Sequence, residues 1–386
     1  MRSTNTRVLD FDAWGPQNSR VQDGMDGVML RHVVQLPGQR LSAGWENVRA
    51  QARSGLYDPG APWEASDGTT TARFDMPWIT SEWQHGAWAW EAGAAWPRLR
   101  ARYVSRYFSQ ITNEDFFAPS ITEGGHTRRL RPRAGLSYRI GPGRALHAAY
   151  IESMHAPASH TLAPVAVGAI AIDHQYQRLG SLARKRAVQL DWEIDARTFA
   201  WGVLSSQSIA NPVFADGRLL VPNLGSSVSD RAGVLAPVGA SGQVVIDAYN
   251  GNPYFSQGRL HQAGAALNRV LTPHWSVLGS YTWAHSRNTG VQHAGNLLPG
   301  VPQHTGVLAN VWRHGARDLT LASLVYRGSR LADEANTQPQ GAGWSFNLVL
   351  FRESADRRWA WTGTLQTPLH GTVRPTLWTS LRYRMD

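Results

Sequence analysis

Apolar and polar residues alternate along much of the chain. Segment 274–290, HWSVLGSYTWAHSRNTG, shows the pattern clearly, because every second position is apolar, aromatic or glycine: Trp275, Val277, Gly279, Tyr281 and Trp283. The positions between them, from Ser276 to Ser286, are mostly small or hydroxylic. A period of two is typical of a β-strand with two different faces. The segment therefore predicts a strand that separates two unlike environments.

The same alternation recurs in segments of about 9–11 residues, a length typical of strands in outer-membrane barrels. Residues 184–208 predict a hairpin that turns near Ala196 and Arg197. Its first strand has Val188, Leu190, Trp192 and Ile194 on one face and Gln189, Asp191, Glu193 and Asp195 on the other. We predict that Phe199, Trp201 and Val203 resume the apolar face after the turn.

The links between these segments alternate in length. Short turns, such as Gly141-Pro142-Gly143, contrast with the long stretches 109–128, 210–256 and 288–301, which are rich in Gly, Asn, Ser and Pro. Short turns at one end and long loops at the other are typical of an up-and-down outer-membrane barrel. We predict an all-β fold, a transmembrane antiparallel β-barrel of about 14–16 strands. It would cover residues 26–386, after a lead-in segment over residues 1–25.

Aromatic residues collect on the apolar faces, near the strand ends. The chain has 17 tryptophans, and tryptophan favours a membrane–water boundary. Trp275 and Trp283 are eight residues apart, about 27 Å along a strand, close to the height of a barrel's apolar band. We predict two aromatic girdles, with these candidates: Trp88, Trp96, Trp192, Trp275, Tyr281, Trp283, Trp344, Trp359 and Tyr383.

A soluble all-β binding protein is the alternative from a different class. A sandwich carries Lys, Glu and Thr on its polar faces to meet water, whereas these faces carry Gly, Ser, Asn, Gln and isolated charges, which suit a wet lumen. A propeller would show a repeat of about 40–50 residues, and none is visible.

The polar faces carry charged residues that we place in the lumen by parity. Arg139, Arg382 and Arg384 would face inward and favour anionic solutes, with Asp191 and Glu193 as local counter-charges. A one-residue bulge would reverse this assignment. The row Asp191, Glu193 and Asp195 also suggests a calcium site, but calcium ligands usually come from a loop that wraps the ion. We therefore favour lumen lining.

Other chemistry is weakly supported. The segment HTRRLRPR, residues 126–133, contains four arginines, which could grip nucleic acid but suit lipid headgroups or lipopolysaccharide at a barrel rim. The net charge of +10 is spread along the chain, so we expect no nucleic-acid partner. Neither an H-E-x-x-H nor a G-x-S-x-G motif is present. We predict no enzyme activity and no catalytic, cofactor or metal-binding residue.

No apolar stretch is long enough for a membrane-spanning helix. The longest, TLAPVAVGAIAI at 161–172, is short and contains proline and glycine. The N-terminus lacks the apolar core of a signal peptide. The chain therefore either stays in the cytoplasm or is a piece of a longer precursor, and we expect the second. The absence of cysteine suits passage through an oxidising periplasm.

Several segments resemble the barrel portion of TonB-dependent receptors. They are LRPRAGLSYRIGPGRALHAAYIESMHAPA at 130–158, NRVLTPHWSVLGSYTWAHSRNTG at 268–290, 298–333, and the terminal LWTSLRYRMD. The family's plug domain and energy-coupling box are not visible, and Met385 stands where a terminal phenylalanine is expected. The chain also resembles the barrel of exopolysaccharide export porins, in which a periplasmic helical-repeat domain precedes about sixteen strands.

We therefore predict a barrel in the Gram-negative outer membrane that transports a solute, receptor-like and without a visible plug. The polysaccharide-export porin barrel is the runner-up. Expected partners are outer-membrane lipid and lipopolysaccharide, the barrel assembly machinery, a small-molecule or polysaccharide solute, and an energy-coupling or periplasmic protein. No cofactor is expected.

Overall fold

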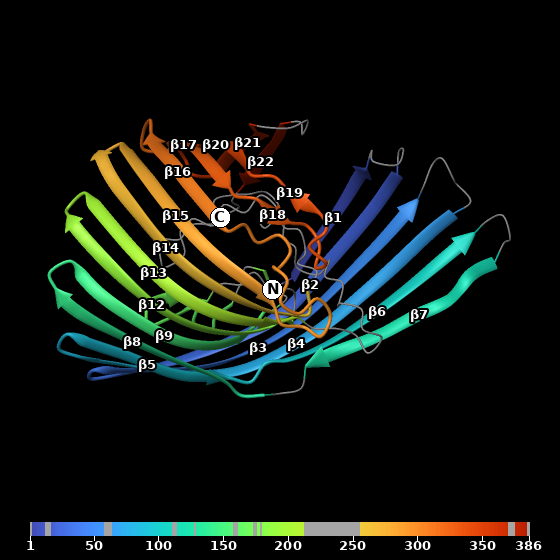
Figure 1. The fold of residues 1–386 in the computed structure, drawn as a ribbon, viewed down its shortest axis with the longest axis horizontal. Helices are drawn as coiled ribbons and strands as arrows, with labels where there is room; N and C mark the ends of the chain where they lie inside the picture. The colour runs from blue at the N-terminus through green and yellow to red at the C-terminus, as the bar shows by residue number, and fades with distance from the viewer. Residues whose placement is uncertain are drawn as a thin grey trace.

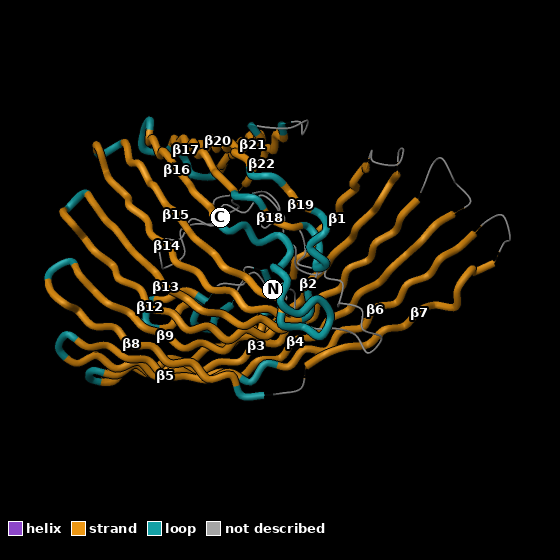
Figure 2. The backbone as a smooth tube through the Cα atoms, in the orientation of Figure 1, coloured by secondary structure: helices purple, strands orange, loops and turns teal. Residues whose placement is uncertain are grey.

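The computed structural model describes residues 2–11, 17–57, 64–109, 114–126, 129–156, 161–172, 176–177, 180–211, 255–369 and 375–383. These residues form one large, strongly curved antiparallel sheet and two small hairpins (Figures 1 and 2). In this part of the chain, no helix is long and apolar enough to cross a membrane.

The large sheet, here called the wall, contains 18 strands among the described residues. Its first half comprises β1 (Arg2–Phe11), β2 (Gln17–Leu36), β3 (Gln39–Tyr57), β4 (Glu64–His85), β5 (Trp88–Ala95), β6 (Arg98–Ser109), β7 (Glu114–His126), β8 (Arg131–Gly141) and β9 (Arg144–Met154). Its second half comprises β12 (Leu182–Asp195), β13 (Thr198–Ala210), β14 (Gln257–Thr272), β15 (Trp275–Asn288), β16 (His304–Arg313), β17 (Asp318–Arg327), β20 (Gly343–Glu353), β21 (Trp359–Pro368) and β22 (Thr376–Tyr383). The small hairpins are β10 (Ala166–Val167) with β11 (Ile170–Ala171), and β18 (Arg330–Leu331) with β19 (Pro339–Gln340).

The wall's strands occupy sixteen positions, because two positions are each shared by two strands. β5 and β6 both pair with β4, one beyond the other, and β8 and β7 continue the next position in the same way. Pro97 separates β5 from β6, and proline cannot donate a hydrogen bond to the ladder. The predicted fold class, all-β with about 14–16 antiparallel strands, is confirmed. Within the described residues no pairing joins β1 to β22, so these two strands are the edges.

Short links gather at one end of the wall and long links at the other, here called the short-turn end and the long-loop end. The turns after β2, β4 and β8 contain Gly38, Gly86 and Gly143, each with a positive φ. At the long-loop end, residues 289–303 connect β15 to β16, and 328–342 connect β17 to β20.

Cross-strand register assigns each residue to one of two faces. Val188, Leu204, Ala263 and Trp283 lie side by side on four adjacent strands, and their convex side is here called the outer face. The alternate residues form the inner face on the concave side, where Gln189 and Leu260 are buried. Along β15 the outer residues Tyr281, Trp283, His285 and Arg287 are exposed, and the inner residues Ala284, Ser286 and Asn288 are buried.

Two details differ from the expectations drawn from sequence. Phe199, Trp201 and Val203 pair with Glu193, Asp191 and Gln189, so their predicted return to the apolar face is wrong. The register slips by one between Glu193 and Asp195, and such a slip exchanges the two faces. Within the predicted lead-in at 1–25, β1 and the first residues of β2 are paired in the wall, because backbone pairing needs no apolar alternation.

The inner face is also partly apolar. Val48, Phe74, Trp78 and Leu99 form a buried cluster on β3, β4 and β6, where sequence parity predicted a wet lumen. Gly44 makes this packing possible, because a Cβ there would lie 2.5 Å from the Trp78 ring.

Candidate functional site

Residues 161–172, here called the strap, fold onto the inner face. The strap belongs to the long link between β9 and β12 and contains the hairpin β10–β11, which contacts β8, β9 and β12. Val167 and Ile170 are fully buried against Ala149, Ile151 and Ala187 of the wall. Gly168 and Ala169 between them have positive φ values of 53° and 67°, which a two-residue hairpin turn requires.

Glu46 of β3 anchors the first half of the strap. Its Oε1 accepts hydrogen bonds from the backbone N–H of Leu162, at 2.8 Å, and of Ala163, at 3.0 Å. The Thr161 hydroxyl donates to the same oxygen. Glu46 is only 1% exposed, and a buried carboxylate needs such partners. The strap therefore supplies the hydrogen-bond donors for a carboxylate that the wall buries.

Three further wall residues hold the strap. The backbone N–H of Gly168 donates to Glu91 Oε2 on β5, at 3.1 Å. Arg133 on β8 donates to the Pro164 carbonyl and Lys185 on β12 donates to the Ala171 carbonyl, each at 3.3 Å.

Gly135 on β8 lets the strap approach the wall closely. A Cβ at this position would lie 2.4 Å from the Gly168 nitrogen and 2.6 Å from its Cα. Backbone atoms cannot rotate away as a side chain can, so the docked strap requires glycine here.

A polar network lies on the inner face nearer the short-turn end. His147 Nε2 is 3.2 Å from Asp191 Oδ2, and Gln189 Nε2 donates to Asp191 Oδ1 at 2.8 Å. The Ser137 hydroxyl lies 2.8 Å from His147 Nδ1. His147 and Gln189 are buried, so the wall itself satisfies these polar groups.

The structure brings some of the predicted lumen residues together. Arg139, Ala145 and Asp191 are in register on adjacent strands of the inner face. Arg139 and Asp191 are thus two strand spacings apart, about 10 Å. Glu193 follows Asp191 toward the short-turn end, whereas Arg382 lies on the same face of the distant strand β22. Arg384 lies outside the described residues.

The structure does not favour the calcium site considered for Asp191, Glu193 and Asp195. Asp191 is bonded to His147 and Gln189, and Asp195 Oδ1 accepts from the backbone N–H of Arg197. Among the described residues, no three His, Cys, Asp or Glu side chains gather where they could hold a metal ion.

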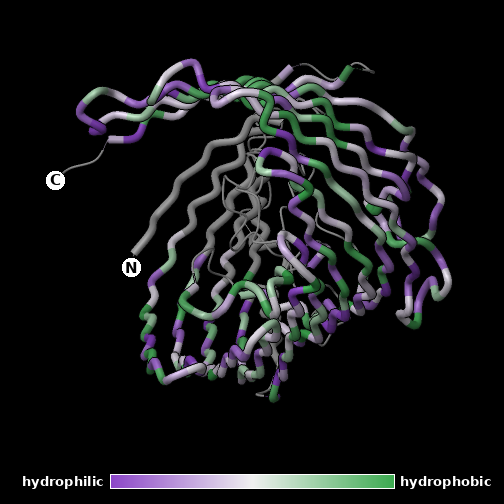
Figure 3. Tube along the Cα trace, turned by 90° about the vertical axis from the view of Figure 1, so that its left-hand side faces the viewer, coloured by the Kyte–Doolittle hydropathy of each residue, from purple (hydrophilic) through white to green (hydrophobic). Residues whose placement is uncertain are grey.

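The nine predicted girdle residues are all exposed, and the eight on wall strands lie on the outer face; Trp96 lies between β5 and β6. At the short-turn end, Trp88 packs against Tyr138 and Trp359 against Tyr383, with ring centroids 4.3 and 4.4 Å apart. Toward the long-loop end, Tyr281 and Trp344 belong to one cross-strand row. Figure 3 shows apolar and polar residues interleaved along the strands.

Sequence reasoning missed other residues. Register places the isolated histidines His261, His285 and His304 on the outer face. Alternation could have revealed this for His285, which shares parity with Trp283. In 126–133, Arg131 pairs with Glu152 at 3.4 Å, and Arg133 holds the strap. The anchors Glu46 and Glu91 carried no local signal.

Two long loops dock on each other at the long-loop end. Asn288 donates to Glu334 Oε1, and the Leu297 N–H donates to Asn336 Oδ1, at 3.1 and 2.8 Å. Asp333 closes the second loop by accepting from Thr337 and from the Gln338 N–H. These bonds lower the pKa of Asp333, with the Thr337 hydroxyl contributing most.

Known structures share this fold. No protein-family model and no curated protein matches the chain. The ferric yersiniabactin uptake receptor FyuA from Yersinia pestis is similar with a TM-score of 0.59 and 12% identity, over 95% of this chain and 52% of that one. The siderophore receptor PiuA from Acinetobacter baumannii has a TM-score of 0.54 and 12% identity, over 91% and 52%. The copper transporter OprC has a TM-score of 0.53 and 10% identity, over 99% and 63%.

The predicted resemblance to a TonB-dependent receptor barrel is therefore confirmed as a likeness of fold. The chain spans about half the length of FyuA and PiuA.

Proposed function

We propose that this chain forms the wall of a Gram-negative outer-membrane barrel that takes up a solute in a receptor-like manner, and that it is not an enzyme. The observation that carries the proposal is the unlike character of the two faces of a strand such as β15. Its outer residues Trp275, Tyr281 and Trp283 are large and exposed, whereas its inner Ser286 and Asn288 are buried and polar. Exposing a large apolar surface to water is unfavourable in free energy, whereas exposing it to hydrocarbon is not.

Closure of the wall is part of the proposal. An edge strand in lipid would leave backbone N–H and C=O groups without partners, at a cost of several kcal/mol each. The edge strands β1 and β22 would therefore pair with each other in the membrane and close the wall. The barrel assembly machinery would insert the wall, and outer-membrane lipid and lipopolysaccharide would surround it.

The solute path would follow the inner face, and the strap would narrow it. Arg139, Arg382 and Arg384 would favour anionic solutes, with Asp191 and Glu193 as counter-charges. The names of the similar structures mention ferric yersiniabactin, a siderophore and copper, so small molecules that carry a metal are the first solutes to test. A periplasmic energy-coupling protein is the expected partner in that case.

Electrophoresis and bilayer recordings test the proposal on the full chain refolded in detergent. A closed barrel should migrate differently before and after boiling, and the pore should favour anions. Arg139→Gln should lower the anion preference, whereas Arg269→Gln, on the outer face of β14, should leave it unchanged. A compact monomer that dissolves without detergent would contradict the membrane wall. A strongly cation-selective pore would contradict the inner-face assignment alone.

A further inference from the structure

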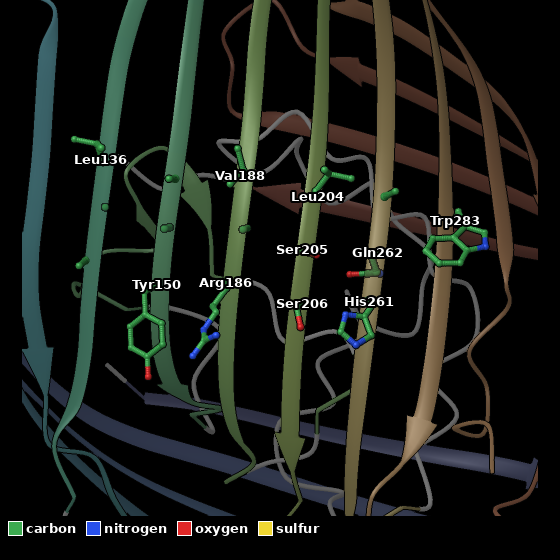
Figure 4. A pocket seen from close by; sticks show the side chains of 16 residues that line it. Leu136, Tyr150, Arg186, Val188, Leu204, Ser205, Ser206, His261, Gln262 and Trp283 are labelled. Atoms are coloured by element: carbon green, nitrogen blue, oxygen red, sulfur yellow. The ribbon is translucent and has the colours of Figure 1, made fainter. Parts of the chain in front are cut away.

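A groove of about 820 Å³ lies on the outer face, over β8, β9 and β12 to β15 (Figure 4). Its floor consists of small residues, including Ala148 and Ala263, and larger apolar side chains, including Leu204 and Trp283, border it. Its volume is within the range of about 300–1,000 Å³ that is usual for ligand sites. One end of the groove is polar, with Tyr150, Arg186, Ser206 and His261.

Register arranges this part of the outer face in three successive rows, each about 7 Å nearer the long-loop end. The first row is apolar: Leu136, Ala148, Val188, Leu204, Ala263 and Trp283. The second is mostly polar: Ala134, Tyr150, Arg186, Ser206, His261 and His285. The third is charged: Glu152, Arg184, Ser208, Arg259 and Arg287. Apolar side chains thus give way to basic ones within about 14 Å.

The positive charge of these rows is mostly uncompensated. Glu152 is their one carboxylate, and it already binds Arg131, Arg184 and the Tyr150 hydroxyl. No carboxylate in the described part of the chain pairs with Arg186, Arg259 or Arg287, and all three are exposed. Guanidinium groups bind phosphate in bidentate fashion, so an anionic partner would fit this surface.

The basic residues form two groups. Arg184 and Arg186 lie on β12, and Arg259 and Arg287 lie on β14 and β15. The small hydroxyl residues Ser206 and Ser208 of β13 lie between the groups. The distance from β12 to β14 is two strand spacings, about 10 Å, which leaves room for a headgroup with more than one phosphate.

We propose that this surface binds a phosphorylated, multiply acylated glycolipid of the outer leaflet, of the lipid A class. An acyl chain lies in the groove, and the phosphates lie on Arg184, Arg186, Arg259 and Arg287. The order of the rows matches the order of acyl chain and headgroup in a lipid whose headgroup faces the long loops. The inference rests on the proposed function, because the long-loop end must reach the outer leaflet.

Native mass spectrometry of the full chain in detergent tests the proposal, with bis-phosphorylated lipid A as the probe. Dephosphorylated lipid A and zwitterionic phosphatidylethanolamine are the comparison lipids. The double variant Arg186→Gln/Arg259→Gln should lower the retained lipid A at least tenfold, because it removes two charge-assisted contacts. Arg269→Gln is the matched control, since Arg269 is an exposed arginine on β14 near the short-turn end. Ala263→Phe, which fills the groove, should lower the retention of both forms of lipid A.

The outcomes separate this inference from the proposed function. Equal retention of phosphorylated and dephosphorylated lipid A, or equal loss in the double variant and in Arg269→Gln, would overturn the lipid site in a chain that is still heat-modifiable. Free inorganic phosphate that competes fully with lipid A would show an anion site without lipid selectivity, and would also overturn it. A chain that is not heat-modifiable would overturn the proposed function itself.

Discussion

Gly135→Ala should release the strap from the inner face. The new Cβ would lie 2.4 Å from the Gly168 nitrogen and 2.6 Å from its Cα, whereas ordinary contacts are about 3.5–4.0 Å. The strap would have to move by about 1 Å. That movement lengthens the hydrogen bond from the Gly168 N–H to Glu91 Oε2, whose N···O distance is now 3.1 Å, beyond hydrogen-bonding distance.

The expected magnitude follows from the bond that is lost. A hydrogen bond to a charged group contributes about 1.5–3 kcal/mol, so the ratio of docked to released strap should fall about 10- to 100-fold. Poorer packing of Val167 and Ile170 would add to this effect. Neither β8 nor the outer face should change.

Two assays report on the strap directly. Limited proteolysis should cleave the variant within residues 161–172 faster than the parent chain, and single-channel recordings should show a larger or noisier conductance. Gly279→Ala on β15 is the control, because a Cβ at that position would have no heavy atom within 4 Å apart from those of its own residue and its two chain neighbours. If Gly135→Ala behaves like Gly279→Ala in both assays, the strap is not held as described.

Three further predictions concern the strap anchor Glu46, Asp333 in the loop 328–342, and the edge strand β22. Glu46→Ala should remove the acceptor of the Leu162 N–H and leave the Ala163 N–H with only the Thr161 hydroxyl, at 3.0 Å, which costs about 1–3 kcal/mol in total. Glu46→Gln, which keeps an oxygen acceptor, should be milder, and the rate of strap proteolysis measures the difference. The pKa of Asp333 is lower in the folded protein than its unfolded value of about 3.9, so the stability that ionised Asp333 gives to loop 328–342 is present above that value and is lost as the pH falls through the lower folded pKa. Proteolysis of this loop should therefore be constant from pH 7 to about 5 and rise in stronger acid. Asp333→Asn should be cleaved faster at pH 7 and should not show the rise in acid. If the wall is closed in detergent micelles, the amides on the free side of β22 should exchange as slowly as those bonded to β21, and fast exchange of alternate β22 amides would refute closure.

Local alternation was enough to predict the strands and most of their faces. A period of two is a property of the extended backbone itself, so the outer positions of β15 and β20 could be identified from Trp275, Trp283 and Trp344 without a partner strand. The division into short turns and long loops likewise follows from the spacing of the apolar segments. The prediction for the faces of β13 was wrong because one slip of register near Glu193, in the hairpin of β12 and β13, reversed the faces of the residues that follow it.

The strap and the basic rows were decided by the tertiary structure. Residues 161–172 are the longest apolar run in the sequence, but Glu46 precedes Leu162 by 116 residues and Glu91 precedes Gly168 by 77. No local pattern pairs a carboxylate with backbone groups so far away. The outer rows similarly bring Arg186, Arg259 and Arg287 together from three strands. The chain's own alternation therefore determined that it forms a two-faced wall, whereas only the closing of distant strands into register determined what each face can hold.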